Sequence, residues 1–278
     1  MGSDDAPMPT PLYLVDAFAD QPFTGNPAAV CLLENIQKTD WMQQVAAEMA
    51  QAETAFVTLR SSGKELGSKS LSEWDLRWFT PLMEVDLCGH ATLAAAHVLG
   101  QLGRIPMDQS VNFHTRSGIL RATPSISQVV LDFPAIALQP VAPLEALIPA
   151  LGVQPLNVWS AGPDIVVEVA DAASVIDMMP DLEQLRFCAQ RGIGVTACGS
   201  DGADVVSRFF APAAGIPEDA VTGSLHCAIG PYWARRLRRD RLRCRQASPR
   251  GGWLDVQIQG ERVLLSGQAR TVMVGAWQ

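Results

Sequence analysis

Two short segments combine glycine with a polar residue in the way that suits an anion-binding helix start. Gly89-His90-Ala91 and Gly223-Ser224-Leu225 each open a segment of helical character. The first backbone N–H groups of a helix have no intrahelical partner, and the helix dipole favours negative charge there. Each segment is therefore suited to a small carboxylate, although His90 and Ser224 could equally serve only as helix caps.

Two acidic residues could take part in the same chemistry. Glu53 stands at the beginning of an apolar, strand-like run, and a carboxylate in that setting is suited to moving protons. Asp219 lies in the loop before Gly223, where it can orient His90 or a substrate hydroxyl or amine. The alternative role of Asp219 is to complement the dipole of the following helix.

The histidine and cysteine spacings predict no metal site. His90 and His97 are seven residues apart, which is about 10 Å along a helix axis. Neither Cys88-x-His90 nor His226-Cys227 has a usual zinc spacing. None of the six cysteines forms a CxxC pair, so we expect reduced thiols and no metal cofactor.

An internal repeat places the two helix starts in equivalent positions. Residues 77–81, Arg-Trp-Phe-Thr-Pro, match residues 208–212, Arg-Phe-Phe-Ala-Pro, and each stretch precedes a loop and then one of the helix starts. The offset is 131 residues at the arginines and 134 at the glycines, so the second loop is three residues longer. The repeat predicts a duplicated α/β unit, and a chain of 278 residues lies where single cores usually divide in two.

Strand-like and helix-like segments alternate in both halves. In the first half we predict strands at 13–17, 28–33, 55–59 and 76–79, a helix beginning at Asp40 with Gln43 in a capping box, and a helix over 91–99. In the second half we predict strands at 128–133, 165–169, 205–210, 254–258 and 263–266, and helices over 182–191 and 227–237.

Composition and charge exclude several classes of protein. Apolar residues make up 48% of the chain, which is too many for a disordered protein. The net charge of −8 argues against nucleic-acid binding; a local run of arginines over 235–245 is either a solvated helix end or a surface for an anion or a partner. No apolar run is long enough for a membrane span and the N-terminus lacks a signal-peptide pattern, so we expect a cytoplasmic protein.

Four motifs resemble, in order, those of the PhzF-like phenazine-biosynthesis family, a branch of the diaminopimelate epimerase fold. They are Val15-Asp16-Ala17-Phe18 with Gly25-Asn26-Pro27, Glu53-Thr54-Ala55-Phe56, Asp86-Leu87-Cys88-Gly89-His90-Ala91-Thr92, and Pro217-Glu218-Asp219-Ala220-Val221-Thr222-Gly223-Ser224. The resemblance covers the chain from about Tyr13 to its C-terminus.

The resemblance implies an α/β (α+β) fold of two pseudo-symmetric lobes, each a mixed sheet curled around a central helix, with the active site between them. The expected lobes are residues 8–120 and 121–267, and a C-terminal strand at about 268–278 returns to the first lobe. Members of the family are typically homodimers that need no metal or organic cofactor.

The resemblance also implies roles for individual residues. Glu53 matches the general acid/base, and His90, Asp219 and Ser224 match the groups that bind and orient the substrate. The neighbouring residues expected to contact substrate are Gly89, Ala91, Thr222 and Gly223. The implied function is a cofactor-independent isomerase that shifts a proton in a small carboxylate-bearing substrate.

Epimerases of this fold use two cysteines, one from each repeat. Cys88 matches the first, but the second position falls on Ala220, so a single-base proton shift by Glu53 fits better. Two alternatives stay open: a racemase or epimerase that uses Cys88 with Glu53, and a non-catalytic protein that binds a small carboxylate or a partner.

Overall fold

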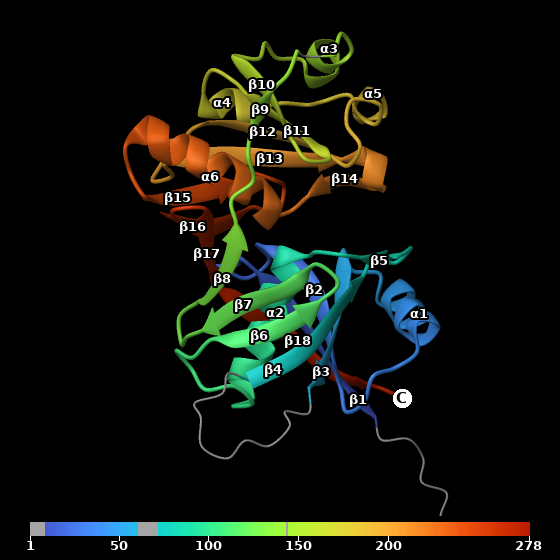
Figure 1. The fold of residues 1–278 in the computed structure, drawn as a ribbon. Coiled ribbons are helices and arrows are strands. Elements are labelled where there is room, and N and C mark those ends of the chain that lie inside the picture. The colour runs from blue at the N-terminus through green and yellow to red at the C-terminus, as the bar shows by residue number, and fades with distance from the viewer. Residues whose placement is uncertain (1–8, 61–71, 143) are drawn as a thin grey trace, which may run out of the picture. The chain divides into compact units, whose positions relative to one another are not determined.

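The computed structural model describes residues 9–60, 72–142 and 144–278, which form two compact units (Figure 1). Unit 1 comprises the described parts of residues 1–17, 27–131 and 268–278, and unit 2 comprises residues 18–26 and 132–267. The first residues of the expected N-terminal lobe and of the N-terminus lie outside the described residues. None of the helices within the described ranges has the length and apolar character that crossing a bilayer requires.

Unit 1 is a mixed sheet with one buried helix. Its elements are β1 (Thr10–Ala17), β2 (Asn26–Leu33), α1 (Thr39–Met49), β3 (Glu53–Leu59), β4 (Ser72–Phe79), β5 (Glu84–Val85), α2 (Gly89–Gln101), β6 (Val111–Thr115), β7 (Gly118–Pro124), β8 (Val129–Pro134, whose last three residues belong to unit 2) and β18 (Ala269–Trp277). Ten of the 13 residues of α2 are buried, as expected for a helix that is apolar on all sides. α2 contacts strands β1, β3, β7 and β18 and is the central helix of the unit.

Unit 2 contains a second set of mixed parallel and antiparallel strands. Its elements are β9 (Gln139–Pro140), α3 (Leu147–Leu151), β10 (Asn157–Ala161), β11 (Asp164–Glu168), α4 (Ala172–Ile176), α5 (Leu182–Leu185), β12 (Ile193–Cys198), β13 (Val205–Ala211), η1 (Pro212–Ala214), β14 (Ile216–Asp219), α6 (Gly223–Leu237), β15 (Arg241–Gln246), β16 (Gly252–Gln259) and β17 (Arg262–Gly267). α6 contacts β12, β15, β16 and β17 and is the counterpart of α2.

The strand pairing confirms the predicted duplication. In unit 1, β2 and β3 pair in parallel, β3 and β4 antiparallel, and β4 and β6 in parallel. In unit 2, β11 and β12, β12 and β13, and β13 and β15 follow the same order of parallel, antiparallel and parallel pairing. Two sets of strands with the same non-trivial order of pairing indicate one repeated unit.

The repeated arginines make the same contact in both units. Arg77 in β4 donates from Nε and Nη2 to the carboxylate of Glu84 in β5, at 2.7 and 2.8 Å. Arg208 in β13 donates in the same way to Glu218 in β14, at 2.8 and 2.9 Å. Each bidentate pair holds a short return strand, β5 or β14, against the longer strand that precedes it, β4 or β13. The return strand then leads to the central helix.

Several local predictions were wrong. The helix expected over 182–191 ends after one turn at Leu185. The expected capping box is absent, because the N-cap of α1 is Lys38 and the amide of Gln43 donates instead to the Thr80 carbonyl at 2.9 Å. Strands β6, β7, β10 and β12 and the short strands β5, β9 and β14 were not predicted, whereas both central helices begin at the predicted glycines, Gly89 and Gly223, ahead of their apolar segments. The predicted boundary after residue 120 falls inside β7, whereas the units divide between Leu131 and Asp132.

Candidate active site

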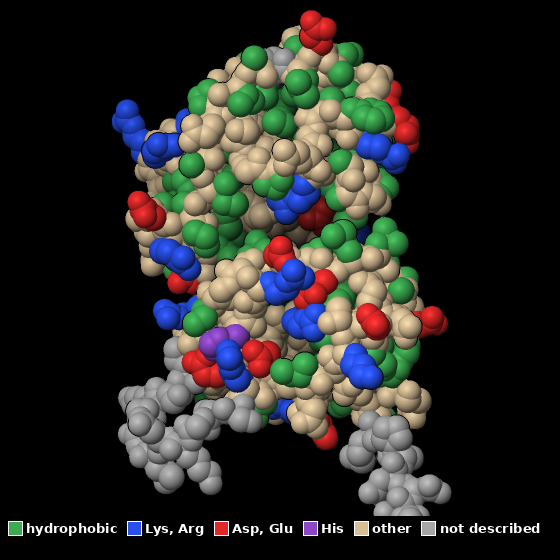
Figure 2. All heavy atoms as spheres, turned by 45° about the vertical axis from the view of Figure 1, so that its right-hand side comes forward, with side chains coloured by type: hydrophobic (Ala, Val, Ile, Leu, Met, Phe, Trp, Pro, Cys, Tyr) green, Lys and Arg blue, Asp and Glu red, His purple; other side chains and the backbone are tan. Residues whose placement is uncertain are grey.

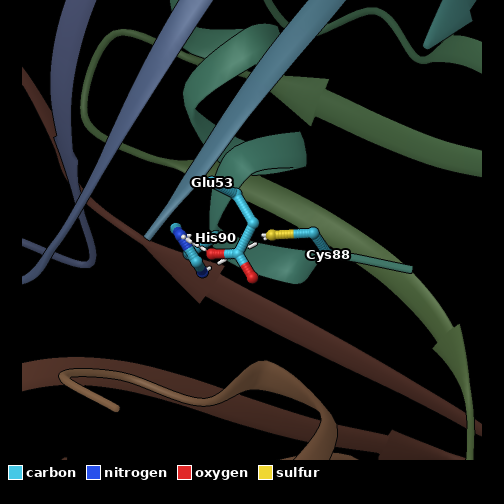
Figure 3. Close-up of side chains that lie close together, drawn as sticks. All are labelled: Glu53, Cys88 and His90. Carbon is cyan, nitrogen blue, oxygen red and sulfur yellow. Dashed lines mark hydrogen bonds and ion pairs between the residues drawn. The ribbon is translucent and has the colours of Figure 1, made fainter. Parts of the chain in front are cut away.

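Three side chains meet at the beginning of the central helix of unit 1 (Figure 3). His90 is the second residue of α2, and its Nε2 lies 3.1 Å from Oε2 of Glu53, the first residue of β3. Cys88, the N-cap of α2, places its Sγ 3.6 Å from Nδ1 of His90. The side chains of His90 and Glu53 are only 7% and 15% exposed. A carboxylate, an imidazole and a thiol thus form one nearly buried cluster.

The backbone explains how residues distant in sequence reach this cluster. Glu53 pairs with Ala28 of the parallel neighbour β2, and the next residue, Thr54, pairs with Phe79 of the antiparallel neighbour β4, so the pairing of β3 fixes the position of Glu53. Cys88 adopts an extended conformation and makes no side-chain cap hydrogen bond. Since His90 lies inside the first turn of α2, its ring is not the helix cap and is directed to Glu53 instead.

The environment sets the protonation of two of these groups. Burial, together with the nearby Glu53 carboxylate, raises the pKa of the Cys88 thiol, so that Cys88 is neutral near pH 7. Burial opposes a charge on the His90 ring, but the Glu53 carboxylate, 3.1 Å away, outweighs it and raises the pKa of His90 above its usual range. His90 therefore carries a proton at neutral pH and holds the Glu53 carboxylate through a charge-assisted hydrogen bond.

The sequence spacings missed one possible set of metal ligands. The ligand atoms of Glu53, Cys88 and His90 lie within 4.8 Å of one another, and such a set can hold a metal ion. Short spacings join only residues close in sequence, whereas Glu53 comes from β3 and the other two residues from the start of α2. A neutral thiol and a protonated imidazole are poor ligands, because a metal would first have to displace both protons. The expectation of no metal stays a prediction.

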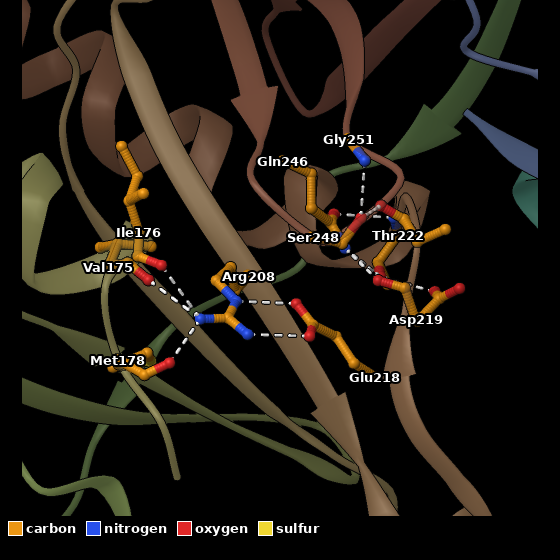
Figure 4. Close-up of polar contacts among 11 residues, drawn as sticks. Val175, Ile176, Met178, Arg208, Glu218, Asp219, Thr222, Gln246, Ser248 and Gly251 are labelled. Carbon is orange, nitrogen blue, oxygen red and sulfur yellow. Dashed lines mark hydrogen bonds and ion pairs between the residues drawn. The ribbon is translucent and has the colours of Figure 1, made fainter. Parts of the chain in front are cut away.

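A second group of predicted residues lies before the central helix of unit 2 (Figure 4). Asp219 accepts hydrogen bonds from Nδ2 of Asn26 at 2.7 Å and from Oγ1 of Thr222, the N-cap of α6, at 2.6 Å. Gln246, which is fully buried, accepts from the backbone N–H of Thr222 at 2.8 Å and donates to the Asp219 carbonyl at 2.8 Å. These contacts hold the Asp219 carboxylate in one orientation.

Ser224, the second residue of α6, has a partner that sequence reasoning missed. Nη2 of Arg191 donates to Oγ of Ser224 at 2.9 Å. Arg191 is itself held by Asp164, which accepts from its Nε at 2.7 Å and also from its Nη2. Ser224 is therefore a hydrogen-bonded residue inside the helix and not its cap.

The return strand that carries Asp219 is anchored by Arg208 (Figure 4). The Nη1 group of Arg208 donates to the carbonyls of Val175, Ile176 and Met178 at 3.5, 3.3 and 2.7 Å, while its other two donors bind Glu218. The repeated Arg-x-Phe-x-Pro motif was the sequence signal for this anchor, although its glutamate partner was not predicted.

The structure thus gathers the predicted residues into two groups, one in each unit. The group in unit 1 contains Glu53 and His90, with Gly89 and Ala91 on either side of His90, and also Cys88. The group in unit 2 contains Asp219, Thr222, Gly223 and Ser224. Asn26, Asp164, Arg191 and Gln246 were not predicted, because their contacts depend on residues at least 24 positions away in the sequence.

Comparisons with known proteins agree with these features. A family described as phenazine biosynthesis-like protein matches residues 15–275. The chain is 45% identical over 271 residues to an uncharacterized isomerase of Halalkalibacterium halodurans, covering 96% of this chain and 97% of that protein. A solved PhzF-family structure from Enterococcus faecalis has a TM-score of 0.88 and 39% identity, covering 98% of this chain and all of the other.

A more distant structure shares the fold alone. A hydroxyproline epimerase from Agrobacterium vitis, with trans-4-hydroxy-L-proline bound, is 12% identical with a TM-score of 0.60 over 96% of this chain and 92% of its own. The resemblance expected from the four motifs and the mixed α/β fold are therefore both confirmed. With its family match, its relatives and its duplicated architecture in agreement, the chain belongs to the phenazine biosynthesis-like (PhzF) family.

Proposed function

We propose that this protein is an isomerase that shifts a proton within a small carboxylate-bearing substrate, with Glu53 as the single base and then the acid. The observation that carries the proposal is the pair of Glu53 and His90, at 3.1 Å in a nearly buried position. The name isomerase given to a relative of 45% identity supports the same reaction class.

The proposed reaction balances without an oxidant or a cofactor. Glu53 removes a proton from a carbon next to a double bond, and the electron pair left behind forms a new double bond to the neighbouring carbon. The pair of the original double bond moves to its far carbon, and Glu53 returns the proton there. Protonated His90 holds the carboxylate in position and offsets its charge. Asp219 and Ser224, with Thr222 and Gly223, are the proposed substrate-binding groups of unit 2.

A two-base racemase that uses Cys88 with Glu53 is the second candidate. Inversion needs one base on each face of a carbon, and each base must come within about 3–3.5 Å of it, so the two bases would stand roughly 6–7 Å apart. Cys88 and Glu53 lie within 4.8 Å of each other, and burial keeps the Cys88 thiol protonated. The single-base proton shift therefore has the better support.

The test is proton NMR in D2O with a panel of small carboxylates, comparing the wild type with Glu53→Gln. We expect deuterium to enter a substrate carbon only with the wild type. A matched control is Glu73→Gln, because Glu73 also pairs with a histidine, His114, in unit 1 and should keep full activity after substitution. Full activity of Glu53→Gln would overturn the proposal.

If none of the carboxylates in the panel took up deuterium, a different function would be favoured. If several carboxylates raised the melting temperature of the protein equally in the wild type and in Glu53→Gln, the chain would be a carboxylate-binding protein without the reaction.

We further propose a cytoplasmic homodimer that acts on a small molecule and binds neither nucleic acid nor membranes.

A further inference from the structure

We infer that Arg191, held by Asp164, is a carboxylate-binding residue that takes in unit 2 the place that the base Glu53 takes in unit 1. The inference rests on the proposed function and deepens it, because it assigns the charged group that recognises the substrate carboxylate.

Strand register places Arg191 next to the counterpart of Glu53. Phe79 and Phe210 are equivalent residues of the repeat, and they pair with Thr54 in unit 1 and with Ile193 in unit 2. The residue before Thr54 is Glu53, and the residue before Ile193 is Gly192. Arg191 is thus one residue from the position that holds the proposed base in the other unit.

The two side chains also contact equivalent partners. Glu53 lies 3.1 Å from His90, the second residue of α2, and Arg191 donates at 2.9 Å to Ser224, the second residue of α6. The equivalent contact to the second residue of the central helix is therefore made by a proton acceptor in one unit and by a permanent cation in the other.

Packing explains why the counterpart of Glu53 is a glycine. A Cβ atom at Gly192 would lie 2.5 Å from the ring of Phe209 and 2.9 Å from the backbone carbonyl of Phe210. Because the backbone atom cannot move aside as a flexible side chain would, this position cannot carry an acid. The polar contact to the central helix is made instead by the preceding residue, Arg191.

The chemistry of Arg191 fits an anion and not proton transfer. A guanidinium has only donors and does not lose its proton in proteins, so Ser224 must accept from it and can donate its own hydroxyl proton elsewhere. Asp164 is buried and orients the guanidinium through two donors, while 38% of the Arg191 side chain remains exposed. A fixed guanidinium beside a serine hydroxyl is suited to a carboxylate.

The test measures binding, so that it does not depend on turnover. Isothermal titration calorimetry with benzoate, malate and proline compares the wild type with Arg191→Gln and Arg191→Lys. We expect at least one carboxylate to bind the wild type, roughly 10- to 100-fold weaker binding to Arg191→Gln, and intermediate binding to Arg191→Lys. Benzamide, which lacks the charge of benzoate, should not distinguish wild type from Arg191→Gln.

Arg262→Gln is the matched control. Arg262 also pairs with one aspartate in unit 2, Asp132, and its side chain is 46% exposed, so its loss should leave carboxylate binding unchanged. If Arg191→Gln unfolds because Asp164 is left buried without its partner, the double variant Asp164→Asn/Arg191→Gln removes both charges and is measured instead.

Two results would overturn the inference. One is equal carboxylate binding by the wild type and the Arg191 variants; the other is no binding of any of the three carboxylates by the wild type. A failure of the proposed function alone gives a different pattern. Arg191→Gln then still weakens carboxylate binding, but neither the wild type nor Glu53→Gln exchanges deuterium into any bound carboxylate.

Discussion

At the scale of single residues, Cys88 stands where a two-base epimerase would need an ionised, reactive thiol. Its sulfur lies against the His90 ring, yet burial and the Glu53 carboxylate raise the pKa of its thiol. A thiol must be ionised to act as a base or nucleophile. Cys88 is therefore a packing and hydrogen-bonding residue of the cluster, which supports the proposal that Glu53 is the base.

Replacement of Cys88 tests this reading. We expect Cys88→Ala to keep turnover within about tenfold of the wild type, because the proton shift does not pass through the sulfur. The measurement is the rate of deuterium incorporation by NMR, alongside the melting temperature. A loss as complete as that of Glu53→Gln, in a folded variant, would instead favour the two-base racemase.

At the scale of elements, α6 carries a buried histidine that the reaction does not need. The Nδ1 of His226 donates to the Thr222 carbonyl at 2.8 Å, and Nε2 lies 3.3 Å from the hydroxyl of Ser207 in β13. Burial lowers the pKa of His226 to about 4, so its ring is neutral in the folded protein. This contact fixes the first turn of α6, which also holds Ser224.

The lowered pKa of His226 predicts a pH-dependent stability. Unfolded histidine titrates near 6.5, so between about pH 6.5 and 4 the unfolded chain binds more protons than the folded one, and stability falls as the pH falls. Over that range His226 accounts for about 3 kcal/mol. Denaturant unfolding at pH 7 and pH 5 should therefore show a larger loss for the wild type than for His226→Gln. Equal losses would show that His226 is not the group responsible.

At the scale of the whole molecule, the two units share one arrangement of strands and helix but carry different charged groups beside the central helix. Their strand orders and Arg–Glu anchors match, but one central helix begins beside an acid and the other beside an arginine. Acidic and basic side chains are interspersed on the face drawn in Figure 2, in keeping with a net charge of −8 without an extended basic surface on that face.

The homodimer is the prediction that belongs to this scale. β18 pairs with β1 and exposes three consecutive apolar residues, Val272, Met273 and Val274, by 51%, 46% and 67%. Apolar residues exposed together on a strand favour association. We expect sedimentation of the wild type at twice the monomer mass of 29.9 kDa, and dissociation of Val272→Lys/Val274→Lys. A monomeric wild type, or an unaffected double variant, would contradict this surface.

The sequence by itself determined the family, the duplication and the two helix starts. These depend on local patterns: a glycine and a polar residue at the first turn, a strand that ends in proline, and four motifs in order. Glu53, His90, Asp219 and Ser224 could be named for that reason. The bodies of α2 and α6 followed from their apolar segments, and their first residues from the two glycines, Gly89 and Gly223.

Only the tertiary structure decided which of these residues touch. The contact of Glu53 with His90 and that of Arg191 with Ser224 join residues 37 and 33 positions apart. Such contacts depend on strand register, and a shift of one residue would turn each side chain to the other face of the sheet. Register is set by the packing of whole sheets against α2 and α6, and no short stretch of sequence contains that information.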